Sequence, residues 1–424
     1  SVYSTINILG LGIGMAGFIV ILIYLNHELS YDQWNPELEK VYKVSERTDE
    51  EILSNTRAPL AGFLKEQDPL VANATRLSVY GDYEVLVSAG ENKIYQKGLV
   101  EADSSFFHIF PYPFLQGDQT TAFNKLNSII INQEVAAKLF GSKNPIGQTI
   151  RLHNAIDCEV TGIMDALSSP SHLQATMILL SSVEKSSNHW ENFSYTTYVK
   201  THRIVPVEEL EKSVDRTYYE HRLKKDQMSF QDFRATGHQA GLFVDALQDL
   251  HKSPKNGASN IMTVSILLAL STLLLLSGTI NFSNLSIATS MRRAKEVGVR
   301  KVMGASRKAL FWQFLGEVAL QCVVAFGIAL LLINLLLPYF KQEFNIQLHL
   351  LQSGRLSVLF FWIALCLLAV IALSGLYPAL FLSRYTTTRV LKGDHAGENK
   401  GFALRNALIV VQFTVSAFFV MAIV

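Results

Sequence analysis

One segment of the sequence is suited to binding a large anionic surface. Residues 291–308 contain seven basic side chains and a single acid, Glu296. The seven are Arg292, Arg293, Lys295, Arg300, Lys301, Arg307 and Lys308. Clustered cations of this kind pair with acidic protein grooves or with anionic lipid headgroups. Charge alone is therefore compatible with a protein-docking element and with a surface helix held by membrane lipids.

A second group of polar residues lies inside an apolar segment. Gln313, Glu317 and Gln321 recur every fourth residue and so share one face of a helix. A carboxylate within a membrane is costly and faces protein or water. Two interpretations follow: hydrogen bonds that hold helices together, or a role in gating or coupling.

Local motifs for catalysis are missing from the sequence. It has no Gly-Lys dipeptide, so a phosphate-binding P-loop is excluded, and no two histidines are spaced for a helical metal-ligand pair. Residues 12–17 match G-x-G-x-x-G, but they lie in an uncharged segment and favour helix packing over nucleotide binding. We therefore expect a non-enzymatic chain without a metal or cofactor of its own.

The chain of 424 residues contains five long uncharged segments. Since about 20 apolar residues cross a bilayer, each is a candidate transmembrane helix. The segments are Ile8–Leu25, Ile261–Ile280, Val318–Pro338, Leu356–Ser383 and Asn406–Val424. The net charge of +1 gives no reason to expect nucleic-acid binding. The sequence predicts an α-helical membrane protein with about five spans.

Basic residues fix the orientation of these spans. Residues 291–308 and 384–405 are rich in Lys and Arg, whereas residues 339–355 contain only Lys341 and Arg355. Short basic loops remain in the cytoplasm. The polar stretch between the first two spans is therefore predicted to be extracytoplasmic.

This extracytoplasmic stretch is predicted to be a large α+β domain. Its short runs of β-branched and aromatic residues indicate strands. We expect strands at Val79–Val87, Ile94–Val100, Ser128–Ile131, Thr149–Leu152, Glu159–Ile163 and Tyr195–Lys200. A helix capped by Asn132 should run to Phe140 and stop at Gly141, and a second should cover Val207–Leu223.

The order of residues in the basic segment resembles a known family. Residues 296–307 read E-V-G-V-R-K-V-M-G-A-S-R, similar to the E-I-G-I-R-K-A-L-G-A-S-R cytoplasmic loop of MacB/FtsX-type (type VII) ABC transporter permeases. Tyr377–Arg384 resembles the end of the last span of a repeat in that family. Ile6–Gly14 and His27–Asp32 resemble the first span and its exit in a Bacteroidetes-type subgroup. Similarity to the MacB-type periplasmic core domain is carried by Asp103–Phe110, Ile130–Gly141, Asn144–Gln148 and Ser171–Leu173.

The resemblance implies a bacterial inner-membrane permease worked by a separate ATPase subunit, which binds the ATP. A cytoplasmic coupling helix would contact the ATPase and pass its closure to the periplasmic domain. By motif match, the coupling residues would be Glu296, Gly298, Arg300, Lys301, Gly304, Ala305 and Ser306. Arg300 and Lys301 would pair with an acidic groove on the ATPase.

Local chemistry adds three expectations in and near the coupling segment. Gly304 permits a left-handed helix stop, Ser306 can cap the following helix, and Pro378 would kink the fourth span. A dimer of permease units and a periplasmic partner are also implied by the resemblance.

These inferences give a domain plan and an expected continuation. The plan assigns residues 1–26 to a first transmembrane helix, 27–258 to the periplasmic domain, 259–383 to an FtsX-like domain with coupling loop 288–310, 384–405 to a cytoplasmic linker, and 406–424 to a fifth helix. Because the first and fifth helices each follow a cytoplasmic segment, we expect a second repeat beyond Val424.

Several functions share such a loop. The leading hypothesis is a permease for efflux, lipoprotein release or resistance to antimicrobial peptides. The alternatives are an FtsX-like scaffold that regulates cell-wall hydrolases, and a membrane signalling receptor. MacB carries a fused ATPase, and the missing P-loop argues against a MacB-like drug-efflux role.

Overall fold

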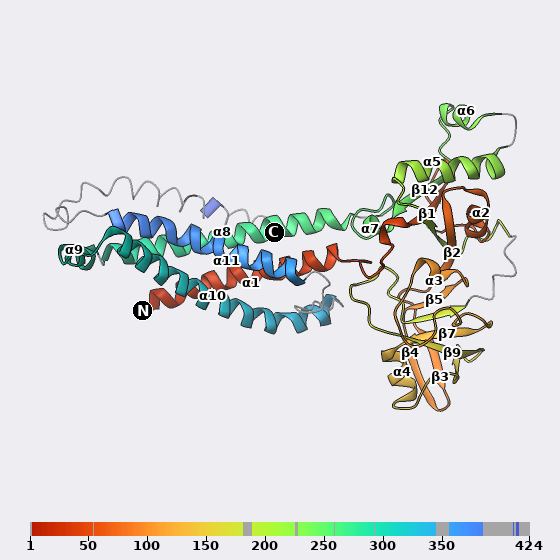
Figure 1. The fold of residues 1–424 in the computed structure, drawn as a ribbon, viewed down its shortest axis with the longest axis horizontal. Helices are drawn as coiled ribbons and strands as arrows, with labels where there is room; N and C mark the ends of the chain where they lie inside the picture. The colour runs from red at the N-terminus through yellow and green to blue at the C-terminus, as the bar shows by residue number, and fades with distance from the viewer. Residues whose placement is uncertain are drawn as a thin grey trace. The chain divides into compact units, whose positions relative to one another are not determined.

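The computed structural model divides into two compact units (Figure 1). The structure describes residues 2–53, 55–180, 189–224, 228–257, 259–292, 294–344, 356–384 and the single positions 410, 413 and 414. One unit, here called the sheet domain, is Glu28–Asn260. The other, the helical unit, comprises Ser1–His27 and Ile261–Val424.

The sheet domain is built on one mixed sheet. In the part of the chain that the structure describes, its order is β12-β1-β11-β2-β5-β10-β7-β9-β8-β3-β4, with β6 paired to β9. The strands are β1 Val41–Arg47, β2 Val71–Val79, β3 Val85–Ala89, β4 Asn92–Gln96, β5 Leu99–Ala102, β6 Phe114–Gly117, β7 Ser128–Asn132, β8 Thr149–Leu152, β9 Ile156–Met164, β10 Met177–Leu180, β11 Thr196–Thr201 and β12 Gly241–Ala246. The pairs β5–β10 and β7–β9 are parallel, and the other pairs are antiparallel.

Short helices cover the sheet and complete its cores. They are α2 Leu60–Gln67, α3 Phe106–Ile109, α4 Gln133–Phe140, α5 Val207–Tyr218, α6 Phe230–Ala235 and α7 Leu247–Leu250, with a 3-10 turn at Leu38–Lys40 and a π-helical turn at Tyr219–Leu223. Leu64 of α2 and Val214 of α5 pack on β1, β11 and β12. Leu139 of α4 packs on β7 and β9. Each of these fully buried side chains contributes about 1.5–3 kcal/mol by removal from water.

The two predicted helices are confirmed. The Asn132 side chain accepts a hydrogen bond from Val135 N at the start of α4, and Gly141 ends the helix with a φ of 61°. The second helix is α5 followed directly by the π-helical turn to Leu223.

Two of the predicted strands are wrong as single strands. Residues 79–87 end β2 and begin β3, with a turn at Gly81 (φ 54°) between them. Residues 94–100 are likewise split between β4 and β5, because Gly98 has a φ of 81°. Positive φ at glycine interrupts a strand that the apolar pattern alone would continue. The other four predicted strands correspond to β7, β8, β9 and β11.

The helical unit contains four helices of membrane-spanning length among the described residues, judged by length and composition. They lie within α1 Val2–Leu29, α8 Asn260–Arg292, α10 Arg307–Phe344 and α11 Leu356–Arg384, and α9 Ala294–Val302 is the short helix between α8 and α10. The first four predicted spans are thus confirmed. The predicted fifth span lies outside the described residues apart from Val410, Phe413 and Thr414, as does the predicted linker apart from Arg384.

Glycines bring the spanning helices close together. A Cβ added to Gly12 would lie 3.1 Å from the Ala325 carbonyl oxygen of α10, and one on Gly14 would lie 3.6 Å from the Leu274 carbonyl oxygen of α8. Asn7 Nδ2 also donates to the Phe282 carbonyl oxygen (3.2 Å) across α1 and α8. The predicted packing role of the glycine-rich segment is therefore confirmed.

Candidate functional site

The end of α9 is a left-handed glycine stop. Gly304 has a φ of 97°, and Ala305 N donates to the Arg300 carbonyl oxygen over 2.9 Å. A residue with a Cβ is strained in this conformation. The prediction that Gly304 ends the helix is confirmed.

The next helix begins with a side-chain cap. Ser306 Oγ accepts a hydrogen bond from Ala309 N (3.2 Å), and α10 starts at Arg307. This satisfies one of the backbone N–H groups left open at a helix start. The predicted cap is confirmed, and only Ala305 and Ser306 separate the glycine stop of α9 from α10.

One side of α9 is buried against the membrane helices. Val297 is 3% exposed and packs with Leu310 and Phe314 of α10 and with Ala379 of α11. The neighbouring Gly298 is also buried. Helix α9 is therefore seated on α10 and α11.

The other side of α9 exposes apolar side chains. Val299 is 58% exposed, Val302 71% and Met303 76%. These three side chains, here called the apolar strip, lie next to Lys301, whose pKa is lowered by burial and by the neighbouring charge of Arg307. Apolar groups left exposed within a basic segment mark a surface suited to a partner.

The structure brings the two predicted groups of polar residues together. Arg300 Nη2 donates to Glu296 Oε1 over 2.7 Å, and Arg300 Nη1 donates to Gln313 Oε1 over 3.0 Å. Gln313 Nε2 in turn lies 3.4 Å from Glu317 Oε1. This polar ladder links α9 to the first turns of α10.

The ladder changes the interpretation of Arg300. Arg300, predicted to pair with an ATPase, is engaged within the chain by two of its nitrogens. Gln313 is exposed, whereas Glu317 and Gln321 are half-buried. The sequence did not predict the Arg300–Gln313 contact, because the two residues are 13 positions apart and lie on different helices. They meet only because the chain turns at Gly304.

The remaining predicted site residue lies in α11. The helix runs through position 378 to Arg384, and the side chain of Pro378 lies outside the described part of the structure. The kink at this proline stays a prediction.

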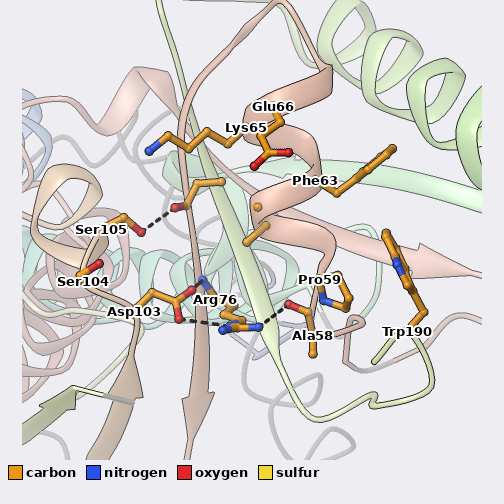
Figure 2. Close-up of a pocket in the computed structure, with 13 residues that line it drawn as sticks. Ala58, Pro59, Phe63, Lys65, Glu66, Arg76, Asp103, Ser104, Ser105 and Trp190 are labelled. Carbon is orange, nitrogen blue, oxygen red and sulfur yellow. Dashed lines mark hydrogen bonds and ion pairs between the residues drawn. The ribbon is translucent and has the colours of Figure 1, made fainter. Parts of the chain in front are cut away.

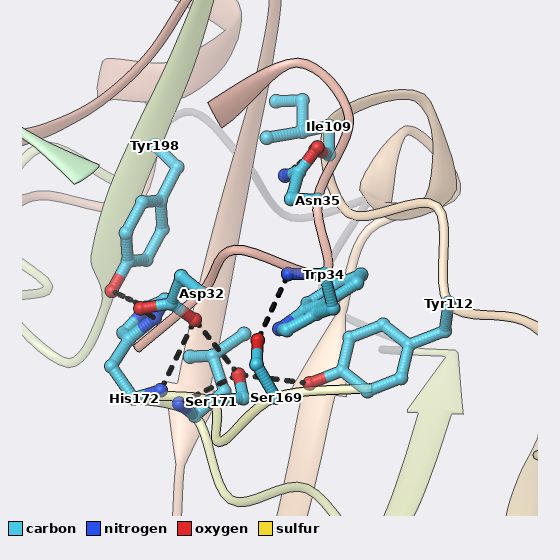
Figure 3. A network of polar contacts seen from close by, with 10 residues as sticks. Asp32, Trp34, Asn35, Ile109, Tyr112, Ser169, Ser171, His172 and Tyr198 are labelled. Carbon is cyan, nitrogen blue, oxygen red and sulfur yellow. Dashed lines mark hydrogen bonds and ion pairs between the residues drawn. The ribbon is translucent and has the colours of Figure 1, made fainter. Parts of the chain in front are cut away.

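Two sequence segments of the sheet domain meet in a buried polar network (Figure 3). Asp32 follows α1, and Ser171 lies 139 residues further along the chain, yet Ser171 Oγ donates to Asp32 Oδ1 over 3.1 Å. Trp34 N donates to Ser169 Oγ (3.0 Å) in the same network. The connection after α1 is thereby fixed to the 169–173 loop.

A pocket of about 420 Å³ lies beside α2 (Figure 2). Its lining includes Arg76 and Asp103, which form a salt bridge with Nε and Oδ1 3.1 Å apart. Arg76 Nη1 also donates to the Ala58 carbonyl oxygen over 2.7 Å. Two of the four charged side chains that line the pocket, Arg76 and Asp103, are thus paired with each other. Among the described residues, no three His, Cys, Asp or Glu side chains are grouped to hold a metal ion.

Comparison with known families matches both parts of the chain. Residues 4–217 match the MacB-like periplasmic core domain, and residues 268–387 match the FtsX-like permease C-terminal domain. The first match covers half of the 424 residues.

Similar proteins point to the same family. A macrolide export ATP-binding/permease protein MacB from Bartonella henselae is 24% identical over 70% of this chain and 41% of that protein. A pyoverdine export ATP-binding/permease protein PvdT from Pseudomonas entomophila is 25% identical over 60% of this chain and 37% of that protein. The chain thus spans less than half the length of these relatives.

Among solved structures, the periplasmic region of MacB from Actinobacillus actinomycetemcomitans is similar, with 15% identity and a TM-score of 0.36, over 52% of this chain and 94% of that one. The two family matches and the four membrane-length helices agree with one another. The chain belongs to the MacB/FtsX-type ABC transporter permeases and is a multi-pass inner-membrane protein with a large periplasmic domain.

Proposed function

We propose that this permease is worked by an ABC ATPase that docks on α9 and passes its motion to the periplasmic domain. The observation that carries the proposal is the two-sided character of α9. Val297 anchors one side on α10 and α11, while the three side chains of the apolar strip are exposed. A helix anchored in this way can transmit force from a bound partner to α10 and α11.

The partner's docking surface should be acidic with an apolar centre. The apolar strip would supply the buried centre of the interface, and the surrounding Lys and Arg residues would steer association and fix orientation. Lys301 is proposed to contact the partner, while Arg300 acts inside the permease as a positioning residue. ATP would be bound by the ATPase itself, since residues 1–424 contain no P-loop.

The turn between α9 and α10 would carry the motion into the membrane. The glycine stop and the Ser306 cap define the geometry of the turn, and the polar ladder joins its two sides. Displacement of α9 would therefore be passed to α10. We propose two permease units for each ATPase dimer. The first cargoes to assay are macrolides and pyoverdine, because two relatives of this chain are named as their exporters.

The test is co-purification with candidate ABC ATPases, followed by an ATPase assay with Gly304→Asp. An Asp at a φ of 97° strains the end of α9, so we expect lost stimulation by the permease. Gly237→Asp is the matched control, since Gly237 also has a positive φ (90°) with open space around it but lies in the periplasmic domain.

The outcomes separate the functions considered. Wild-type protein that neither binds nor modulates any ATPase would rule the proposal out. ATPase coupling without movement of cargo would point to an FtsX-like scaffold. Ligand binding to the periplasmic domain with no ATPase partner would favour a receptor.

A further inference from the structure

The polypeptide leaves the periplasmic domain at two places, Glu28 near the end of α1 and Asn260 at the start of α8. Both contact His251, which follows α7. The ring Nε2 of His251 lies 2.8 Å from Glu28 Oε2, and Asn260 Nδ2 donates to the His251 carbonyl oxygen over 2.9 Å. One residue thus joins the two connections.

The contacts around His251 are partly shielded from water, because the His251 side chain is 20% exposed. Glu28 is 6% exposed, and the His251 ring stacks on Tyr31 with centroids 3.4 Å apart and planes 8° apart. A hydrogen bond to a carboxylate is stronger in such surroundings than at a surface. His251 therefore holds the chain after α1 and the chain before α8 in a fixed arrangement.

Four residues after Glu28, the chain is fixed again at Asp32. Its side chain is fully buried, and its backbone has a φ of 60°, which is uncommon for a residue other than glycine. Asp32 Oδ1 accepts from Ser171 Oγ (3.1 Å) and His172 N (3.2 Å), and Asp32 Oδ2 lies 2.8 Å from His172 Nδ1. Asp32 N donates to the Pro170 carbonyl oxygen over 2.8 Å.

His172 continues the contacts into the sheet. With Nδ1–H donating to Asp32, Nε2 accepts from the Tyr198 hydroxyl, 2.9 Å away. Burial, followed by the charge of Asp32, raises the pKa of Tyr198, so its hydroxyl keeps the proton it donates. Figure 3 shows the Tyr198 hydroxyl at His172. Tyr198 lies on β11, which is between β1 and β2 in the sheet.

We infer that residues 28–32, here called the junction, pass displacement of α1 to the centre of the sheet. The path runs through Asp32, His172 and Tyr198. His251 holds the start of α8 to the same junction. The inference rests on the proposed function, because it assumes that α1 and α8 are moved from the cytoplasm. Strand β11 is hydrogen-bonded on both edges, so a force on Tyr198 is shared by β1 and β2.

The geometry distinguishes this path from ordinary packing. A series of directional hydrogen bonds to a buried carboxylate fixes the relative orientation of the groups that it joins. The path also uses a residue in a sparsely populated backbone conformation, and such residues concentrate where structure is functionally constrained.

The test is hydrogen–deuterium exchange of the full-length permease with its ATPase, without nucleotide and with MgATP plus vanadate. We compare the wild type with Tyr198→Phe and His251→Ala. Tyr112→Phe is the matched control for the first variant, because the Tyr112 hydroxyl is 3.5 Å from Ser171 Oγ and off the path. His238→Ala is the control for the second, since His238 pairs with Asp49 elsewhere in the domain.

In the wild type, we expect nucleotide to change exchange in both α9 and β11. In Tyr198→Phe and His251→Ala, the change in α9 and the ATPase rate should persist while the change in β11 is largely lost. Both controls should respond like the wild type. Tyr198→Phe removes a single hydroxyl. If thermal unfolding shows that His251→Ala is unstable, Tyr198→Phe alone still tests the path.

Three contrary results have different meanings. Variants whose β11 responds as strongly as that of the wild type would overturn the junction and leave ATPase docking intact. A wild type with no nucleotide response in α9 would instead remove the proposed function, and the junction with it. A general loss of protection throughout the domain in Tyr198→Phe would show the contact to be structural only.

Discussion

Arg300 is the residue whose role the structure changes most. A basic residue in a cytoplasmic loop is ordinarily assigned to an external anion, yet two nitrogens of Arg300 bind Glu296 and Gln313. Its guanidinium can reach both partners because it is planar and forked. Under the proposed function, the charges that would meet the ATPase are therefore those of other basic residues, and Arg300 would set the position of α9.

A double-mutant cycle tests this role. Arg300→Lys and Gln313→Leu should each lower permease-dependent ATPase stimulation, by roughly fivefold or more if the coupling between the two proteins is lost. Because both changes break the same contact, the double variant should be little worse than either single one. The measurement is the stimulated ATPase rate at saturating permease. Fully additive effects would show that Arg300 and Gln313 act separately.

Cys158 provides a second test at the residue scale. Its side chain is fully buried, and burial, followed by the charges of Asp157 and Glu101, raises the pKa of the thiol to about 12. Because an ordinary thiol has a pKa of about 8.5, this group destabilises the folded state as pH rises from that value toward 12. At lower pH the thiol stays protonated and unreactive.

The measurement is labelling with N-ethylmaleimide in a Cys322→Ala, Cys366→Ala background near pH 8. Native protein should remain unlabelled, and denatured protein should label completely. Rapid labelling of the native protein would contradict the buried environment of Cys158.

At the scale of elements, the turn between α9 and α10 was predictable because its chemistry is local. A glycine that must adopt positive φ and a serine that caps a helix act within a few residues of themselves. The same rule explains α4, with Asn132 and Gly141 at its ends. The strand errors at Gly81 and Gly98 arose where a glycine interrupted an otherwise continuous apolar pattern.

Substitutions in this turn should loosen α9 without unfolding the protein. Ser306→Ala removes the cap of α10 and should cost about 1 kcal/mol, and Gly304→Ala should cost about 1–2 kcal/mol because of its φ. Hydrogen exchange should become faster in residues 300–310 in both variants. Gly316→Ala is the control, since Gly316 has open space and lies within α10. Unchanged exchange in the turn would show that cap and stop do not hold it.

At the scale of the whole molecule, hydropathy and basic residues were sufficient to predict the membrane helices and the orientation, because both depend on composition over long segments. The order of the strands could not be predicted from the sequence, because β1 pairs with β11 and β12 from the far end of the domain. The junction was hidden for the same reason: the partners of Asp32 and Glu28 are 139 and 223 residues away. His27–Asp32 and Ser171–Leu173 both resemble segments of the family, but nothing in the sequence indicates that they meet.

The central claim is that α9 is the docking surface for an ATPase, and a photo-crosslink tests it most directly. A photoreactive amino acid replaces Met303, which is 76% exposed on α9, and a control replaces Tyr95, which is 69% exposed on β4 of the periplasmic domain. After illumination of cells that contain the candidate ATPase, Met303 should yield a permease–ATPase adduct and Tyr95 should not. If the two proteins co-purify but position 303 crosslinks only to lipid, α9 lies on the membrane surface and the account is contradicted.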